Sequence, residues 1–573
     1  MINRNQIHKI FFILPKGTIF GLLLMLITSL VMTVLEVFSV ALIVPLLTTL
    51  VDSSKKDFIL SYFIFLKKYN DTEILIIILS FFLLVFIFKN ILLVLFNSIK
   101  SKFTYKIFNK ITYRIYQNYL NKKYSFFIKK NSSEFIRNII SETNIFSLGV
   151  VSNLITLASD IIVVFCISSF LLLYNFKVSF FVIFFNFILG FLLLKFTNKK
   201  FKRWGYLRQK YSARIYKNLQ ESFGYLREII LSNSQSYFLK RHFNFNMESS
   251  NASIKRDIYS ALPRPILETI ALCIFYFLIL ILVYTNFDKS EILIFIGVIF
   301  FASIKLLPGI NNIIKSLQAI KYGSSAIEII YNELKNINEH RSEIDKKILN
   351  KNFSRIIFKH VSFIYEKSEK YIIKNLHFEI KRNDKVGIVG LSGSGKTTFL
   401  NLFTGLLSCT EGEITLDNKN IIDVFNQWKK NIGYVHQNTF LADEAILFNI
   451  TLKKTLNDIE ILRIWKILKI VEMDKYINSL ELGLDTVIGE RGCKLSGGQS
   501  QRLGLARVLY SNPSVIILDE ATSALDEETQ RKVLKSIYMM KNKTIISVSH
   551  RINALKYCNK IFSFKNGKLN RIK

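Results

Sequence analysis

The sequence predicts a two-part fold, in which an α-helical membrane domain of six spanning helices precedes an α/β domain with a phosphate-binding loop. Long apolar stretches recur along roughly the first 320 of the 573 residues. A helix needs about 20 mostly apolar residues to cross the hydrocarbon core of a bilayer. Beyond residue 352 the apolar runs become short and alternate with helical segments, which is typical of an α/β domain with a largely parallel sheet.

Six stretches are long and apolar enough to span a membrane. The third and fourth are separated only by residues 175–177, which predicts a tight hairpin. Residues 58–69 are too short to span and carry basic residues at one end, so they fit a short external helix on the membrane surface. An extension of the second helix or an ordinary loop are the alternatives. The six ranges are 18–50, which is long enough to extend past the bilayer, then 74–98, 148–174, 178–198, 262–284 and 291–318.

Basic residues predict the orientation. The net charge of +35 would suggest nucleic acid as a partner of a soluble protein, but here Lys and Arg cluster between the apolar stretches, so no nucleic acid is expected. Segments 99–147 and 199–257 are strongly basic, whereas 51–73 is balanced. The positive-inside rule then places both basic segments and both termini in the cytoplasm. The two basic segments also have helical patterns, so the membrane helices are expected to continue into the cytoplasm.

The domain boundaries follow from where the apolar stretches stop. We expect a transmembrane domain at 1–325, a linker at 326–352 and the α/β domain at 353–573. The five cysteines show no paired spacing, which argues against disulfide or metal roles. Strands are predicted at 386–389, 432–435, 515–518 and 545–548.

Residues 390–397 fit the pattern G-x-x-x-x-G-K-[ST]. They follow a predicted strand and precede an apolar helical segment at 399–403, which is the strand–loop–helix context that this motif requires. Glycines let backbone N–H groups approach phosphates, and the N-terminus of the helix favours an anion. Lys396 is therefore expected to reach the β- and γ-phosphates of a nucleotide, and Thr397 to hold Mg²⁺.

An acidic pair ends the strand predicted at 515–518. Asp519 can support a metal ion, and Glu520 can polarise a water molecule. Acidic residues also end many strands without any function. The distance from the phosphate loop and the sequence that follows, Ala-Thr-Ser-Ala-Leu-Asp up to Asp526, favour the catalytic interpretation.

The run Leu-Ser-Gly-Gly-Gln at 495–499, followed by Ser-Gln-Arg, is the most specific motif. With the phosphate loop, the acidic pair, Ser523–Asp526 and His550 in this order, the C-terminal domain resembles the nucleotide-binding domain of ABC transporters, whose signature motif is this run. The resemblance implies an exporter-type half-transporter, in which one chain supplies one membrane domain and one ATPase domain. It also implies a homodimer, because each ATP lies between the phosphate loop of one copy and the signature of the other.

The resemblance assigns roles residue by residue. Tyr365 is similar to the aromatic residue that stacks on adenine, with an aromatic of the strand core as the alternative. Gln437 is similar to the glutamine that senses the metal and couples to the membrane domain. The implied catalytic residues are Glu520, His550 and Gln437. The implied Mg²⁺ ligands are Thr397, Gln437 and Asp519. The implied ATP contacts are Tyr365, Gly390, Ser392, Gly393, Ser394, Gly395, Lys396, Thr397, Thr398, Ser496, Gly497, Gly498, Gln499 and Asp519.

Three basic residues lie in or beside spanning stretches: Lys89, Arg264 and Lys305. A charge inside the membrane is costly, so it usually faces a cavity or a partner. Glu36 and Glu268 are candidate partners, and ion pairing or snorkelling is the alternative to ligand binding. With the external segment, the membrane half resembles bacterial flippases of lipid-linked oligosaccharides, which implies that the three basic residues contact a pyrophosphate. Two of them are Lys, which keeps the charge but lacks the bidentate fork of Arg.

The leading hypothesis is a flippase that moves a polyprenyl-pyrophosphate-linked oligosaccharide across the bacterial inner (cytoplasmic) membrane. It would contact membrane lipid, use ATP and Mg²⁺, and keep its ATPase domain in the cytoplasm. A general exporter of lipids, drugs or peptides is the main alternative, because the ATPase motifs carry no information on cargo. A third hypothesis is an ATP-gated channel or regulator, against which the intact Glu520 and His550 argue.

Overall fold

The computed structural model describes residues 4–44, 71–174, 176–284, 289–335, 353–366, 368–550 and 552–573. The chain divides into two compact units. One unit comprises residues 1–122 and 126–340, and the other comprises residues 123–125 and 341–573. The first is helical and the second is α/β, as the sequence predicts.

Helical structure continues into the segment expected to be the linker. α14 spans Ser324–Lys335, because Ala326, Ile327, Ile330 and Leu334 form an apolar face that is buried in the helical unit. The rest of the expected linker, 336–352, and the expected external helix, 58–69, lie outside the described residues.

Six helices of the described chain are long and apolar enough to cross a membrane, which confirms the predicted number. α5 and α9 contain 50 and 49 residues, far more than the about 20 that a span requires. Each therefore carries a long polar extension, as expected from the helical pattern of the basic segments. The helical elements of the first unit are α1 Arg4–Ile13, α2 Thr18–Ala41, α5 Asp71–Leu120, α6 Tyr124–Lys129 (which begins in the second unit), α7 Ser132–Arg137, the π-helices η3 Asn138–Glu142 and η4 Ile145–Val151, α8 Ser152–Tyr174, α9 Phe176–Gly224, α10 Leu226–Leu231, α11 Gln235–Ala261, α12 Pro263–Tyr284, α13 Lys289–Tyr322 and α14.

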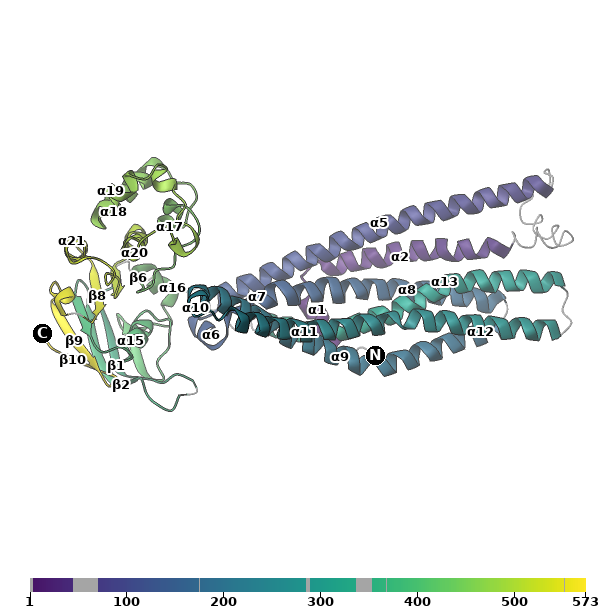
Figure 1. Ribbon diagram of the computed structural model, residues 1–573, viewed down its shortest axis with the longest axis horizontal. Coiled ribbons are helices and arrows are strands. Elements are labelled where there is room, and N and C mark those ends of the chain that lie inside the picture. The colour runs from purple at the N-terminus through teal and green to yellow at the C-terminus, as the bar shows by residue number, and fades with distance from the viewer. Residues whose placement is uncertain are drawn as a thin grey trace. The chain divides into compact units, whose positions relative to one another are not determined.

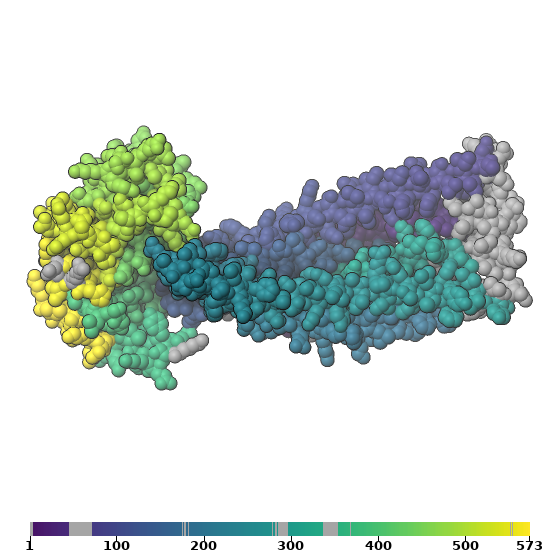
Figure 2. Space-filling model, viewed as in Figure 1, coloured from purple at the N-terminus to yellow at the C-terminus, as the bar shows by residue number. Residues whose placement is uncertain are grey.

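The long helices of this unit run side by side (Figure 1), with α9 against α11, α13 against α8 and α2 against α8. In the space-filling view α5 forms one long edge of the unit (Figure 2). α9 and α13 approach closely at Gly205, where a Cβ atom would overlap the carbonyl oxygen of Tyr322. Phe201, Trp204 and Tyr322 are buried at this crossing and join α9 to α13.

A six-stranded sheet forms the centre of the α/β unit, in the order β10-β9-β3-β8-β7-β6. All neighbouring strands in it are parallel except β9 and β10. β3, β6, β7 and β8 confirm the four predicted strands. The strands of this sheet are β3 Lys385–Val389, β6 Ile432–Val435, β7 Val515–Asp519, β8 Thr544–Ser549, β9 Lys560–Lys565 and β10 Lys568–Arg571.

A second sheet, antiparallel and in the order β2-β1-β4-β5, was not predicted. Its strands alternate buried and exposed side chains irregularly, so no clear period marks them in the sequence. The strands are β1 Arg355–Phe363, β2 Ile373–Lys381, β4 Glu411–Leu416 and β5 Lys419–Asn420.

The helices of the α/β unit are α15 Lys396–Phe403, α16 Phe425–Trp428, η5 Lys429–Asn431, α17 Ile446–Thr451, α18 Asp458–Ile470, α19 Asp474–Asn478, η6 Gly483–Asp485, η7 Glu490–Gly492, α20 Gly497–Ser511, α21 Glu527–Tyr538 and η8 Ile552–Leu555.

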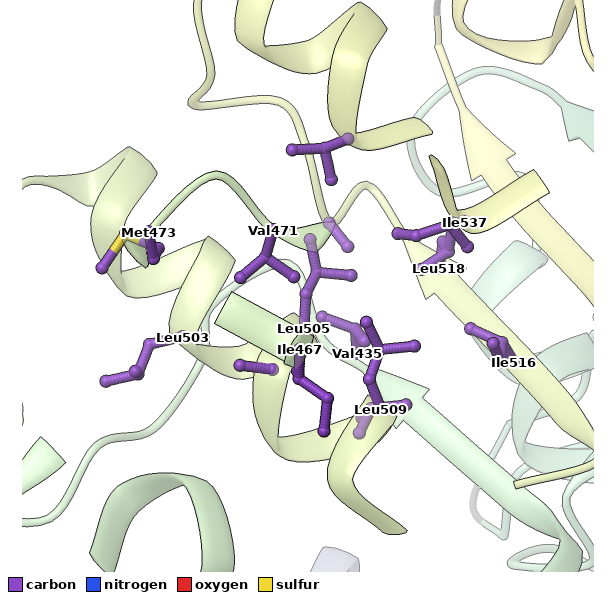
Figure 3. Packing of buried hydrophobic residues seen from close by; sticks show 14 of the residues in the cluster. Val435, Ile467, Val471, Met473, Leu503, Leu505, Leu509, Ile516, Leu518 and Ile537 are labelled. Atoms are coloured by element: carbon purple, nitrogen blue, oxygen red, sulfur yellow. The ribbon is translucent and has the colours of Figure 1, made fainter. Parts of the chain in front are cut away.

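Two hydrophobic cores fix the strands that carry the site. One core joins β6, β7 and β8 to α18, α20 and α21, with Val435, Leu509 and Leu518 among its members (Figure 3). The other joins the two sheets around α15, where Phe358 stacks on Phe399 at a centroid distance of 5.2 Å. These cores hold the carboxyl ends of β3, β6, β7 and β8 in fixed positions, at the edge of a parallel sheet where ligands usually bind.

Candidate functional site

The phosphate-binding loop connects β3 to α15, as predicted. Gly393 and Gly395 have positive φ values of 76° and 109°, a region that other residues adopt only with strain. Gly395 is the residue before the first turn of α15, so the loop turns directly into the helix. The free N–H groups of that first turn and the helix dipole therefore face the loop and favour an anion.

Lys396 lies over the loop that precedes it. Its Nζ donates to the carbonyl oxygens of Gly390 at 2.8 Å and Leu391 at 2.9 Å. Burial lowers the pKa of Lys396, and the negative charges of Glu520 and Asp519 partly oppose this shift. The buried hydroxyl of Ser394 finds no hydrogen-bond partner among the residues that the structure describes. An ammonium group, an unpaired hydroxyl and free N–H groups together fit the phosphates of a nucleotide.

The acidic pair at the end of β7 has partners from two neighbouring segments, one at the end of β6 and the other after β8. Gln437 Nε2 donates to Glu520 Oε2 at 2.9 Å, and His550 Nε2 lies 2.6 Å from Glu520 Oε1. The Tyr434 hydroxyl donates to Asp519 Oδ2 at 2.7 Å. The structure thus brings together Gln437, Asp519, Glu520 and His550, which lie up to 113 positions apart in the sequence.

The oxygen ligands expected for Mg²⁺ have the right chemistry. Thr397, Gln437 and Asp519 offer hydroxyl, amide and carboxylate oxygens, which are hard ligands of the kind Mg²⁺ prefers. Thr397 is in the first turn of α15, and Asp519 ends β7. In the described residues no group of three or more His, Cys, Asp or Glu side chains could hold a metal ion, so a transition-metal site of that kind is not found there.

The signature residues form the start of α20. Ser496 caps the helix: the backbone N–H of Gln499 donates to Ser496 Oγ at 3.2 Å, and the Gln499 side chain accepts from the Ser496 N–H at 2.8 Å. Gly497 and Gly498 follow in the first turn of the helix. Across the described residues, no hydrogen bond or ion pair joins this helix start to the phosphate loop of the same chain.

Two residues near the site were not assigned a role from the sequence. One is Tyr434, described above. The other is Gln501, whose Nε2 donates to the carbonyl oxygen of Gln437 and to Ser523 Oγ, both at 3.2 Å, while its Oε1 accepts from Ala524 N–H at 3.0 Å. Gln501 follows the signature by two positions, which is the signal that could have identified it.

Tyr365 lies beside the phosphate-loop helix. Its hydroxyl is 3.2 Å from Thr398 Oγ1, and its ring meets that of Phe363 edge-on at a centroid distance of 4.9 Å. The ring is half-buried against the core between the two sheets. Stacking on adenine stays a prediction for this residue.

Known proteins share both parts of the chain. Residues 373–523 match the family model described as ABC transporter, and residues 22–308 match the model described as ABC transporter transmembrane region. The chain belongs to the ABC transporter family. The resemblance inferred from the signature motif is confirmed at this level.

Individual relatives of this transporter include exporters and flippases. It is 30% identical over 399 residues to the ATP-dependent lipid A-core flippase of Pasteurella multocida (strain Pm70), a match that covers 66% of this chain and 65% of that protein. It is 38% identical over 216 residues to a Staphylococcus aureus (strain bovine RF122 / ET3-1) protein named for multidrug export, with 37% of each covered. The chain thus spans less than two thirds of the length of these curated relatives.

A solved structure shows the same fold. The structure of a bacterial Atm1-family ABC exporter with ATP bound matches with a TM-score of 0.79, covering 96% of this chain and 94% of that chain. The sequence identity is 20%, so the match concerns the fold alone. The fold of this transporter is therefore of the exporter type, as predicted.

In the membrane unit, the basic residues pair with the two expected acids. Lys89 Nζ lies 2.7 Å from Glu36 Oε2, and Lys305 Nζ lies 3.3 Å from Glu36 Oε1. Arg264 Nε lies 2.7 Å from Glu268 Oε1, one turn further along α12, and the Arg264 side chain is 70% exposed. Among the described residues no hydrogen bond or ion pair joins Arg264 to either lysine. The structure therefore groups the two lysines and places Arg264 in a separate pair.

Proposed function

We propose that this chain is an ATP-hydrolysing exporter that works as a homodimer, with Mg²⁺ as cofactor. The observation that carries the proposal is the position of Glu520, next to Asp519 at the end of β7 and held by Gln437 and His550. A carboxylate fixed on two sides and adjacent to a metal ligand can polarise the attacking water. Gln437 and His550 serve this role by orienting Glu520, and Lys396 with the loop N–H groups binds the phosphates.

The test is Glu520→Gln, measured as Mg²⁺-dependent ATP hydrolysis by the purified protein. Turnover should fall by at least about 100-fold, which is typical of losing a general base, while ATP binding should be kept. Glu528→Gln is the matched control, because Glu528 is a surface carboxylate that pairs with Lys532. Near-normal hydrolysis by Glu520→Gln would show that another group activates water.

We further propose that the cargo is a polyprenyl-pyrophosphate-linked oligosaccharide, moved across the bacterial inner membrane by a flippase of the PglK type. The support is that the buried Lys89 and the partly buried Lys305 come together on Glu36 in the spanning helices, because a site for uncharged hydrophobic cargo needs no such pair of basic side chains. The relative from Pasteurella multocida is itself named as a lipid flippase. A general exporter of drugs, lipids or peptides is the second candidate, favoured by the name of the Staphylococcus aureus relative.

The cargo is tested by replacing Lys89, Arg264 and Lys305 together with Ala. Flipping of a lipid-linked oligosaccharide in proteoliposomes should be abolished, because the positive charges that bind the pyrophosphate are lost. Basal ATP hydrolysis should survive, since the phosphate loop belongs to the other unit. Flipping at the wild-type rate would remove the binding role and favour the general exporter.

A further inference from the structure

One buried amide connects the signature helix to two segments around Glu520. Gln501 of α20 is 5% exposed. Its Nε2 donates to the carbonyl oxygen of Gln437 and to Ser523 Oγ, both at 3.2 Å, and its Oε1 accepts from the Ala524 N–H at 3.0 Å. A side-chain amide has two donors and one acceptor oxygen. All three are therefore used to join α20, the segment after β6 and the segment after β7.

The segment after β6 is held along one side of α20, at helix positions spaced by three. The first contact is that of Gln501. A Cβ atom at Gly504 would lie 2.5 Å from Thr439 Oγ1, so the segment runs close to the helix there. Arg507 Nη1 then donates to the carbonyl oxygen of Phe440 at 2.9 Å. The buried leucines of α20 pack in the core beside β6 and β7 (Figure 3), so the helix fixes the position of this segment.

The turn after β7 has a strained backbone at Glu520. Its φ of 51° lies in the left-handed region, which a residue with a side chain adopts at a cost and keeps only where its surroundings hold it. The Ser523 N–H closes the turn by donating to the Glu520 carbonyl oxygen at 3.1 Å. Gln501 bonds the Ser523 side chain and the Ala524 N–H, so it holds the end of this turn.

The two segments meet where Gln437 Nε2 donates to Glu520 Oε2 at 2.9 Å. We propose that Gln501 is a positioning residue for ATP hydrolysis, which holds the Gln437 amide against the Glu520 carboxylate by tying both segments to α20. The inference rests on the proposed function, because it takes Glu520 to be the group that polarises water. Gln501 acts through Gln437, so its loss should slow turnover and leave ATP binding unchanged.

Two substitutions remove the bonds that matter and keep the length of the side chain. Gln501→Glu keeps an acceptor for the Ala524 N–H but has no N–H to donate to Gln437 or Ser523. Gln501→Met has no amide at all and adds no charge. Both variants should separate the two segments, and agreement between them excludes an effect of the new carboxylate.

The experiment measures kcat and KM for Mg²⁺-ATP with the purified full-length protein. Both Gln501 variants should lose about tenfold or more in kcat, the usual effect of removing a group that orients the residues of a metal site, at unchanged KM. Gln530→Glu is the matched control. The Gln530 amide donates to the carbonyl oxygen and the hydroxyl of Thr522, at 3.2 and 2.9 Å, so it holds the same turn from α21 and should be dispensable for turnover.

A double-mutant cycle separates positioning from general support of the fold. Gln501→Met is combined with Gln437→Ala, which removes the side chain that Gln501 is proposed to hold. The second substitution should then cost little further activity, and the combined loss should be smaller than the product of the two single losses. Independent structural damage would instead multiply the losses.

The outcomes distinguish this inference from the proposed function. If the Gln501 variants turn over ATP like wild type while Glu520→Gln does not, Gln501 is not a positioning residue and the role of Glu520 stands. An equal loss in Gln530→Glu, multiplied losses in the cycle, or Gln501 variants that never elute as a monodisperse species would show a structural role and overturn the inference. Near-normal hydrolysis by Glu520→Gln would overturn both.

Discussion

At the scale of single residues, Tyr434 connects the strand before Gln437 to Asp519, the carboxylate that we propose binds the metal ion. Its hydroxyl donates to Asp519 Oδ2 at 2.7 Å. Burial and the adjacent negative charge of Asp519 hold the pKa of the Tyr434 phenol well above its usual range, so the hydroxyl stays protonated and remains a donor. A hydrogen bond to one carboxylate oxygen fixes the direction in which the other can face a metal ion.

Tyr434→Phe should therefore weaken the response to Mg²⁺. We expect the Mg²⁺ concentration needed for half-maximal ATP hydrolysis to rise by about tenfold, the low end of the effect of losing a hydrogen bond to a metal ligand. ATP binding without Mg²⁺ should not change. Tyr510→Phe is the control, because its hydroxyl also donates to a carboxylate, that of Glu460, at 3.1 Å, away from the site. Equal Mg²⁺ dependence in the two variants would contradict the positioning role of Tyr434.

The sequence predicts some residues of this site better than others. Glu520 and Asp519 could be predicted because they are adjacent and end an apolar strand, and Lys396 because its loop has fixed spacing; their roles stay predictions. Tyr434 could not, because it lies 85 positions from Asp519 and a tyrosine in a strand is usually a core residue. In the membrane unit the acids Glu36 and Glu268 were expected partners. Glu268 pairs with Arg264 one turn away on the same helix, whereas the contacts of Glu36 with Lys89 and Lys305 depend on how α2, α5 and α13 pack.

At the scale of elements, the crossing of α9 and α13 depends on the absence of a side chain. A Cβ atom at Gly205 would overlap the carbonyl oxygen of Tyr322, whose backbone cannot move without shifting α13. Ser325 Oγ also donates to the Gly205 carbonyl oxygen at 3.4 Å. Close helix contact through small residues is a common way of packing membrane helices, and here it joins the polar extensions.

Gly205→Ala should therefore destabilise the helical unit by about 1–3 kcal/mol, the usual cost of overpacking. The measurement is the thermal midpoint of the detergent-solubilised protein, followed as loss of the monodisperse peak. Gly224→Ala on the same helix is the control, since a Cβ there meets no atom within 4 Å; it should be neutral or slightly stabilising. Equal midpoints for the two variants would mean that the crossing tolerates a methyl group.

Among the elements, the strands that consist of short apolar runs could be predicted from the sequence. The local form of helices that depends on packing could not. The strands β3, β6, β7 and β8 are short runs of apolar residues, and the sequence predicts each of them within one residue of its observed ends. The π-helices Asn138–Glu142 and Ile145–Val151 lie inside a segment that was expected only to be helical. π-helical turns are rare and have no local sequence pattern that marks them.

At the scale of the whole molecule, the two parts of the proposed ATP site are not joined within the described residues of one chain. The phosphate loop offers an ammonium group and free N–H groups, and the capped start of α20 offers further N–H groups. Within the described residues these two parts share no hydrogen bond. Two copies related by symmetry can place the α20 start of one against the loop of the other, so that bound ATP stabilises the dimer by mass action.

Mixed dimers test this arrangement. A Lys396→Ala chain and a Ser496→Arg chain, carrying different tags, are co-expressed and the heterodimer is isolated. One of its sites combines both substitutions, while the other combines an intact Lys396 with an intact Ser496. The heterodimer should therefore trap ATP at about one site per dimer, whereas the Lys396→Ala homodimer should trap almost none, although turnover in the heterodimer can still require both sites. If the heterodimer traps no more nucleotide than the Lys396→Ala homodimer, or if single copies in nanodiscs hydrolyse ATP, the site does not need a second chain.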